Sequence, residues 1–293
     1  MPMNTLISPW FAGRAILLTV VLFLTTFAGM QPAEASTQGQ SARPPRDGSG
    51  SAAGRLERSG LIAYSEGRYD KAAQNFAEAI RASENNGASS ARGHGQLLSN
   101  LAWLYHEQGR VTEADSLLRL ALAIDQRAFR PGALPVAHRT QELGMLHHAQ
   151  GRFQEAGQLL VQALSLYEKN SDADGREIAI TQHQIGVNYH ATGDLHRGEL
   201  FIKRALAGLG RNTGDRRYWA ASILDLAELY RSAHRDAEAS QAYGRALREA
   251  NALSSQDGTG NGLVFNSHSV LLRRIEAIRA ADHRTKKSGE GKK

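Results

Sequence analysis

The chain has 293 residues, of which 41% are hydrophobic, and a formal net charge of +6. It contains no cysteine, which excludes disulfides, thiolate metal sites and a lipoprotein anchor. The charge excess lies in residues 36–55 and 284–293, so the part between them offers no basic surface for nucleic acid.

Residues 1–35 have the features of a secretory signal peptide. Arg14 precedes an apolar run from Ala15 to Met30, and Ala33-Glu34-Ala35 places small residues where a signal peptidase recognises them. We expect cleavage after Ala35. The mature protein would then be exported, periplasmic or secreted, with no stable membrane insertion. The alternative is an uncleaved segment that anchors the protein in the inner membrane.

Residues 36–54 are rich in Ser, Gly, Pro, Gln and Arg and contain almost nothing to bury. This composition predicts a disordered linker between the targeting segment and the folded part. The folded part is therefore expected to begin near residue 55.

From residue 55 to about residue 252 one pattern is written five times. Glycine recurs at residues 67, 109, 151 and 193, and the fifth position of this series is His234. Two slots always hold a small residue, namely Gly60, Ala102, Gly144, Gly186 and Ala227, and then Ala72, Ala114, Ala156, Gly198 and Ala239. A bulky slot holds Phe76, Leu118, Leu160, Ile202 and Tyr243. A fixed period with the same residue sizes in the same slots indicates a repeat array.

Each copy is predicted to form two antiparallel helices joined by a short turn. Leu98, Leu101 and Tyr105 recur at three- and four-residue spacing, which places them on one helix face. Gly109 is expected to end that helix, since glycine adopts the left-handed conformation without penalty. Neither helix can bury its apolar stripe alone, so burial must come from stacking against the next copy. The copies span approximately residues 55–86, 95–128, 137–170, 179–211 and 220–252.

These residues resemble the tetratricopeptide repeat, whose usual period is about 34 residues. A spacing such as that from Gly67 to Gly109 is similar to the longer variety found in kinesin light chains. The likeness is clearest in Leu101-Ala102-Trp103-Leu104-Tyr105, in Gly109-Arg110, and in Gly132 followed by Pro135-Val136-Ala137. The resemblance implies an all-α fold, a right-handed α-α superhelix of about five helix pairs.

A further amphipathic helix is predicted at residues 263–282, where Val270, Leu271 and Ile275 alternate with arginines. It would cap the exposed end of the solenoid. A degenerate sixth repeat is the alternative. Residues 283–293 are expected to form a basic, disordered tail.

The resemblance also indicates a binding site, because family members generally hold extended peptides against the first helix of each pair, on the concave wall. Three slots of that helix are expected to face the groove. The last-turn slot holds Tyr64, His106, His148, His190 and Arg231. One turn earlier lie Leu61, Trp103, Met145, Val187 and Glu228. A polar slot beside them holds Asn100, Glu142, Gln184 and Asp225, and would contact a peptide backbone.

The three histidines of the last-turn slot do not suit a metal. Stacked helices lie about 10 Å apart, whereas zinc needs every donor within ~2.1 Å. We therefore expect no metal and no cofactor, and hydrogen bonds from these histidines to water or ligand. His147, in a slot where other copies have tyrosine, is expected to pack in the core. Trp103 could stack on a ligand ring or pack between repeats, and both interpretations stay open.

Known catalytic motifs are absent from the sequence: there is no H-E-x-x-H, no G-x-S-x-G and no phosphate-binding glycine loop. The sequence therefore favours a non-enzymatic, exported scaffold or adaptor that binds a peptide or protein segment in its concave groove. A structural subunit of a cell-envelope complex and an accessory or regulatory subunit of an enzyme remain alternatives. The oligomeric state is left open.

Overall fold

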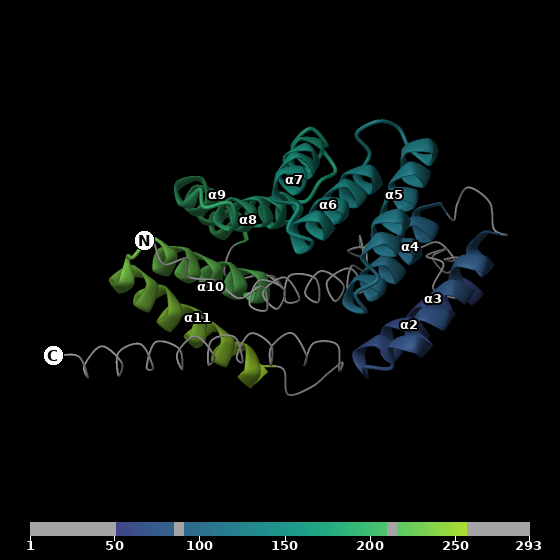
Figure 1. Ribbon diagram of the computed structural model, residues 1–293, viewed down its shortest axis with the longest axis horizontal. Coiled ribbons are helices and arrows are strands. Elements are labelled where there is room, and N and C mark those ends of the chain that lie inside the picture. Colours follow the sequence, from purple (N-terminus) through teal and green to yellow (C-terminus); the bar gives the residue numbers. More distant parts are fainter. Residues whose placement is uncertain (1–50, 85–90, 210–215, 257–293) are drawn as a thin grey trace, which may run out of the picture.

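The computed structural model describes residues 51–84, 91–209 and 216–256, and over these residues all regular structure is helical (Figure 1). The helices are α2 (Ala52–Ser65), α3 (Tyr69–Glu84), α4 (Ala91–Glu107), α5 (Val111–Ala128), α6 (Leu134–Ala149), α7 (Phe153–Glu168), α8 (Gly175–Ala191), α9 (Leu195–Leu209), α10 (Arg216–Ser232) and α11 (Asp236–Gln256). The predicted signal peptide, most of the linker, the capping helix and the tail lie outside the described residues.

The helices form five antiparallel pairs, from α2 with α3 to α10 with α11. The second helix of each pair also packs against the first helix of the next. First helices of neighbouring repeats touch as well, α4 with α6, α6 with α8, and α8 with α10, which places them on the inner side of the curve. In Figure 1 the pairs follow one another along an arc, and this arrangement confirms the predicted all-α solenoid. None of the described helices is long and apolar enough to cross a membrane.

The turns within the pairs have the backbone conformation that the recurring glycines predict. Gly67, Gly109, Gly151 and Gly193 all have φ between 74° and 83°. Each turn is closed by a hydrogen bond from the following residue back to the helix, as from Arg110 N to Tyr105 O at 2.8 Å. This bond satisfies a carbonyl that the helix end would otherwise leave without a partner.

The small residues lie where the two helices of a pair cross. Ala102, Ala114 and Ala156 are completely buried, and the bulky Leu118 and Leu160 fill the space beside them. The buried residues of consecutive repeats join into shared clusters, so that Trp103 of the second repeat packs with Met145 of the third. Each repeat therefore completes its core with its neighbour, as the sequence pattern predicts.

Candidate functional site

The last-turn slot of the inner helices forms contacts from one repeat to the next. Tyr64 on α2 donates a hydrogen bond to Glu107 on α4. His148 Nδ1 on α6 lies 2.9 Å from Asn188 Oδ1 on α8. His190 Nε2 on α8 lies 2.9 Å from Ser232 Oγ on α10. Most of the predicted binding row thus also links neighbouring inner helices.

The remaining members of that row differ in exposure. His106 is half-buried and its ring contacts Trp103 edge-on, with ring centroids 5.9 Å apart. Arg231 is exposed and pairs with Glu228 on its own helix at 2.6 Å. The row therefore runs along the inner side from Tyr64 in the first repeat to the exposed Arg231 at the end of α10 in the fifth.

Trp103 and Met145, from the slot one turn earlier, lie in the core. Trp103 is 1% exposed and Met145 5% exposed, within one cluster that also contains Leu118. The structure therefore agrees with the interpretation that Trp103 packs between repeats. A large aromatic ring at this slot fills the space between the second and third repeats.

The polar slot forms a second set of links between repeats. Asn100 Nδ2 donates to Glu57 Oε1 at 3.1 Å, and Gln141 Nε2 donates to Gln184 Oε1 at 2.8 Å. His183 Nε2 lies 2.8 Å from Asp225 Oδ2. Asn100, Glu142 and Gln184 are all buried. A ligand could use these amide and carboxylate groups only after the links between repeats had broken.

Glu142 belongs to a buried ionic cluster around Arg139, which the sequence analysis missed. The guanidinium of Arg139 forms an ion pair with Glu142 and lies 3.2 Å from Asp125 Oδ2 through Nε. It also donates to Ser99 Oγ at 2.5 Å and to Gln96 Oε1 at 2.8 Å. The cluster joins α4, α5 and α6. Removing one partner from such a buried cluster is strongly destabilising because it leaves an uncompensated charge.

Burial sets the protonation of the inner side chains. It lowers the pKa of His106, and it lowers the pKa of His148 although the hydrogen bond with Asn188 opposes the shift. Burial also raises the pKa of Glu57 and of Glu107. The inner side therefore disfavours isolated charge, and these two histidines are neutral at neutral pH.

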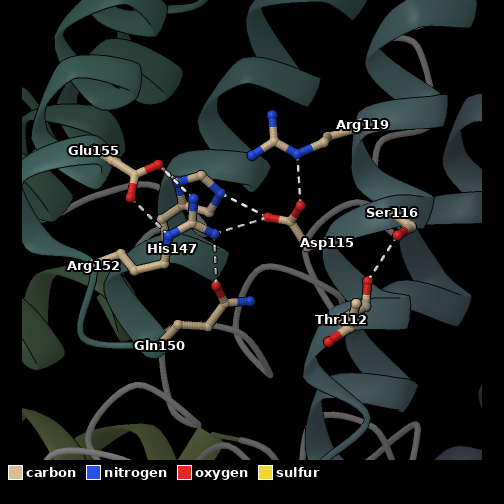
Figure 2. Close-up of polar contacts among 8 residues, drawn as sticks. All are labelled: Thr112, Asp115, Ser116, Arg119, His147, Gln150, Arg152 and Glu155. Atoms are coloured by element: carbon tan, nitrogen blue, oxygen red, sulfur yellow. Dashed lines mark hydrogen bonds and ion pairs between the residues drawn. The ribbon is translucent and has the colours of Figure 1, made fainter.

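A cluster of charged residues surrounds His147 at the contact between the second and third repeats (Figure 2). His147 Nε2 donates to Asp115 Oδ1 at 2.8 Å, and the ring is 2% exposed. Arg152 Nη1 lies 3.1 Å from the same oxygen, and Arg119 Nε lies 2.6 Å from Asp115 Oδ2. Arg152 also forms an ion pair with Glu155. This placement confirms that His147 is a packed core group.

Within the described ranges, no three histidine or acidic side chains come together as a metal site. An open hollow of about 420 Å³ lies at the first turn, between Gly67–Lys71 and Gln108. It contains none of the residues predicted to bind a ligand, so it does not define the site.

Comparisons with known proteins agree with the repeat architecture. A family model described as tetratricopeptide repeat matches residues 53–127 and 136–210. The solved structure of BtubC from P. vanneervenii is similar with a TM-score of 0.60 at 20% identity, covering 85% of this chain and 94% of that one. A putative kinesin light chain from Podosopora anserina with nearly identical repeats has a TM-score of 0.55 at 19% identity, covering 69% of this chain and 96% of that one.

A third similar structure is a Rap protein complexed with Competence and Sporulation Factor. Its TM-score is 0.59 at 16% identity, covering 81% of this chain and 68% of that one. At these identities the structural likeness establishes the fold alone. No curated protein sequence matches the chain.

Proposed function

The chain belongs to the tetratricopeptide repeat family, and from this premise we propose that it is a non-enzymatic, exported scaffold. It binds a peptide or protein segment along the inner side of its first helices. The last-turn row carries the proposal, because stacking repeats places one side chain per repeat at regular intervals. All of its members are partly or fully exposed, namely Tyr64, His106, His148, His190 and Arg231.

A regular row of this kind suits an extended segment, whose own groups also recur at regular intervals. The polar character of the row supplies hydrogen-bond donors and acceptors, and Arg231 supplies a fixed positive charge. The Rap protein complexed with Competence and Sporulation Factor supports the proposal, since a protein of similar fold there forms a complex with a second molecule. Export rests on the signal-like residues 1–35.

A capture experiment with matched variants tests this function. The mature chain is cross-linked in envelope extract, and captured proteins are identified by mass spectrometry. Arg231→Gln removes an exposed charge from the inner row, whereas Arg204→Gln removes an exposed charge from α9, a second helix. We expect Arg231→Gln, alone or with His190→Gln, to weaken capture of a specific partner several-fold. Arg204→Gln should capture it like the wild type.

The reverse result would overturn groove binding. Loss of capture in Arg204→Gln alone would place the partner on the second helices, as in a structural subunit of an envelope complex. Thermal unfolding of each variant, monitored by circular dichroism, shows whether the substitution has changed the fold instead.

A further inference from the structure

Two contacts between repeats are closed by equivalent residues. Asp115 on α5 and Glu199 on α9 occupy the same slot, two repeats apart. Each accepts from the arginine that follows the turn of the next repeat. Arg152 Nη1 lies 3.1 Å from Asp115 Oδ1, and Arg235 Nη1 lies 2.6 Å from Glu199 Oε2. An acid of one repeat thus holds an arginine of the next at both contacts.

The two contacts keep the sign of the charge at equivalent slots, with Glu199 for Asp115 and Lys203 for Arg119, but they differ in the hydrogen-bond donor on the first helix. At the contact between the fourth and fifth repeats, Tyr230 OH donates to Glu199 Oε1 at 3.2 Å. At the contact between the second and third, His147 Nε2 donates to Asp115 Oδ1 at 2.8 Å. This slot holds Tyr105, Tyr189 and Tyr230 in the second, fourth and fifth repeats and Ala63 in the first, so a histidine stands where three of the other four repeats have tyrosine. A phenol stays neutral over the physiological range, whereas an imidazole changes charge there.

The charged groups linked to His147, directly or through Asp115, balance one another when it is neutral. Asp115 and Arg119 come from α5, and Arg152 and Glu155 come from the turn before α7 and its first residues (Figure 2). These are two carboxylates and two guanidiniums. Uncharged Gln150 accepts from Arg152 at 3.2 Å, while His148, the neighbour on α6, contacts Asn188 on α8.

A proton on His147 would add one positive charge to this closed cluster. The free ring nitrogen, Nδ1, lies 3.7 Å from Glu155 Oε2, beyond a hydrogen bond, and that carboxylate is already paired with Arg152. The added proton would therefore sit on a buried ring nitrogen that has no hydrogen-bond acceptor, so no new bond would offset the cost of removing this charge from water. Opening the contact would hydrate it.

We propose that Asp115, Arg119, His147, Arg152 and Glu155 form a pH-sensitive lock, which joins the second and third repeats at neutral pH and opens when His147 takes up a proton. Burial lowers the pKa of His147, the hydrogen bond with Asp115 opposes this shift, and the charge of Arg152 adds to it. The closed form therefore binds fewer protons than the open form. Closure is fully favoured above the ordinary histidine pKa of about 6.5, and it weakens as the pH falls below that value.

Native-state hydrogen exchange of the full chain at pH 7.5 and 5.5, corrected for intrinsic rates, measures this opening. If His147 takes up a proton only in the open form over this range, the equilibrium constant for opening should rise about tenfold from pH 7.5 to pH 5.5. We expect that rise in the amides of α5 and α6 in the wild type. His147→Tyr introduces the tyrosine found in three other repeats and removes the titrating group. In this variant the equilibrium constant for opening should be nearly the same at both pH values. Other histidines, such as His148, contribute equally to both proteins and cancel in the comparison.

The reciprocal variant and a substitute keep the test decisive. Tyr230→His should add a pH-dependent opening to the contact between α9 and α10, because it converts that contact to the titrating type. If His147→Tyr does not fold, His147→Gln supplies a non-titrating donor to Asp115 and carries the same expectation. An unchanged pH response in a folded, non-titrating variant, or no rise in the wild type, would overturn the lock.

Discussion

His234 holds a backbone conformation that the other four repeats give to glycine. Its φ is 57°, and the turn is closed by the same hydrogen bond, from Arg235 N to Tyr230 O at 2.9 Å. For a residue with a side chain this region costs about 1–2 kcal/mol. The packing of α10 against α11 therefore holds the turn in place against local strain.

Replacing His234 with glycine should stabilise the protein. Relief of about 1–2 kcal/mol of strain is offset by about 0.4–1 kcal/mol for the greater freedom of glycine in the unfolded chain. The central values of these two ranges give a net gain of about 0.8 kcal/mol in the free energy of unfolding, measured by urea denaturation. Gly109→Ala should shift the unfolding midpoint in the opposite direction. Equal midpoints for His234→Gly and the wild type would show that the strain is not there.

Residue roles at the turns could be predicted from the sequence, but those of the inner polar residues could not. A turn glycine has one geometric requirement, which its spacing reveals. Neighbouring residues on a helix are about 100° apart, so the sequence suggests that Gln141 and Glu142 face different surroundings, yet both are 1% exposed and both bond to a neighbouring inner helix. Spacing alone does not decide whether either of them faces a ligand. The polar residues beside the predicted slot, Ser99, Gln141 and His183, were the signal that this face links repeats.

Helices α8 and α9 lie too close at their crossing to admit a Cβ on Gly186. The fourth repeat has glycine at both crossing positions, Gly186 and Gly198, where every other copy has at least one alanine. A Cβ on Gly186 would lie 2.9 Å from the backbone N of Ile202 and 3.0 Å from the carbonyl O of Gly198. Backbone atoms cannot swing away, so the helices themselves would have to separate.

Gly186→Ala should therefore lower the free energy of unfolding by about 1–3 kcal/mol, the usual penalty of overpacking. Gly244→Ala on α11 is the matched control. There the nearest atom to the added Cβ would be Arg248 Nη1 at 3.6 Å, so the better helix propensity of alanine should stabilise by up to about 1 kcal/mol. Urea denaturation of both variants measures the contrast. If Gly186→Ala also raised the free energy of unfolding, α8 and α9 would be able to move apart without cost, contrary to this prediction.

The repeat period predicted that the helices exist. It did not predict their first residues, because these depend on local capping. The array was expected to begin near residue 55, but α2 begins at Ala52. Ser51 accepts a hydrogen bond from Gly54 N at 3.0 Å and caps the helix. That serine lies in a stretch whose overall composition favours a linker, and composition does not distinguish a capping serine from a solvated one.

On the scale of the whole molecule, the proposed export of the protein depends on residues 1–35 and can be tested directly. If residues 1–35 are a cleaved signal, N-terminal sequencing of the exported protein should begin at Ser36. The physical reason is the pair of small residues, Ala33 and Ala35, at the positions that a signal peptidase reads. Intact Met1 in a membrane fraction that resists alkaline extraction would instead establish an inner-membrane anchor.

The slot of Asp115 also limits how such an array can gain or lose repeats. The same slot holds Gly157 in the third repeat, and the slot of Arg152 holds Asp194 in the fourth. Excision of the third repeat alone would bring Asp115 to face Asp194, two like charges. Excision of the third and fourth together would bring Asp115 to face Arg235, which restores the attraction. At this point in the chain, loss of the third repeat alone would therefore weaken the contact, whereas loss of the third and fourth together would preserve it.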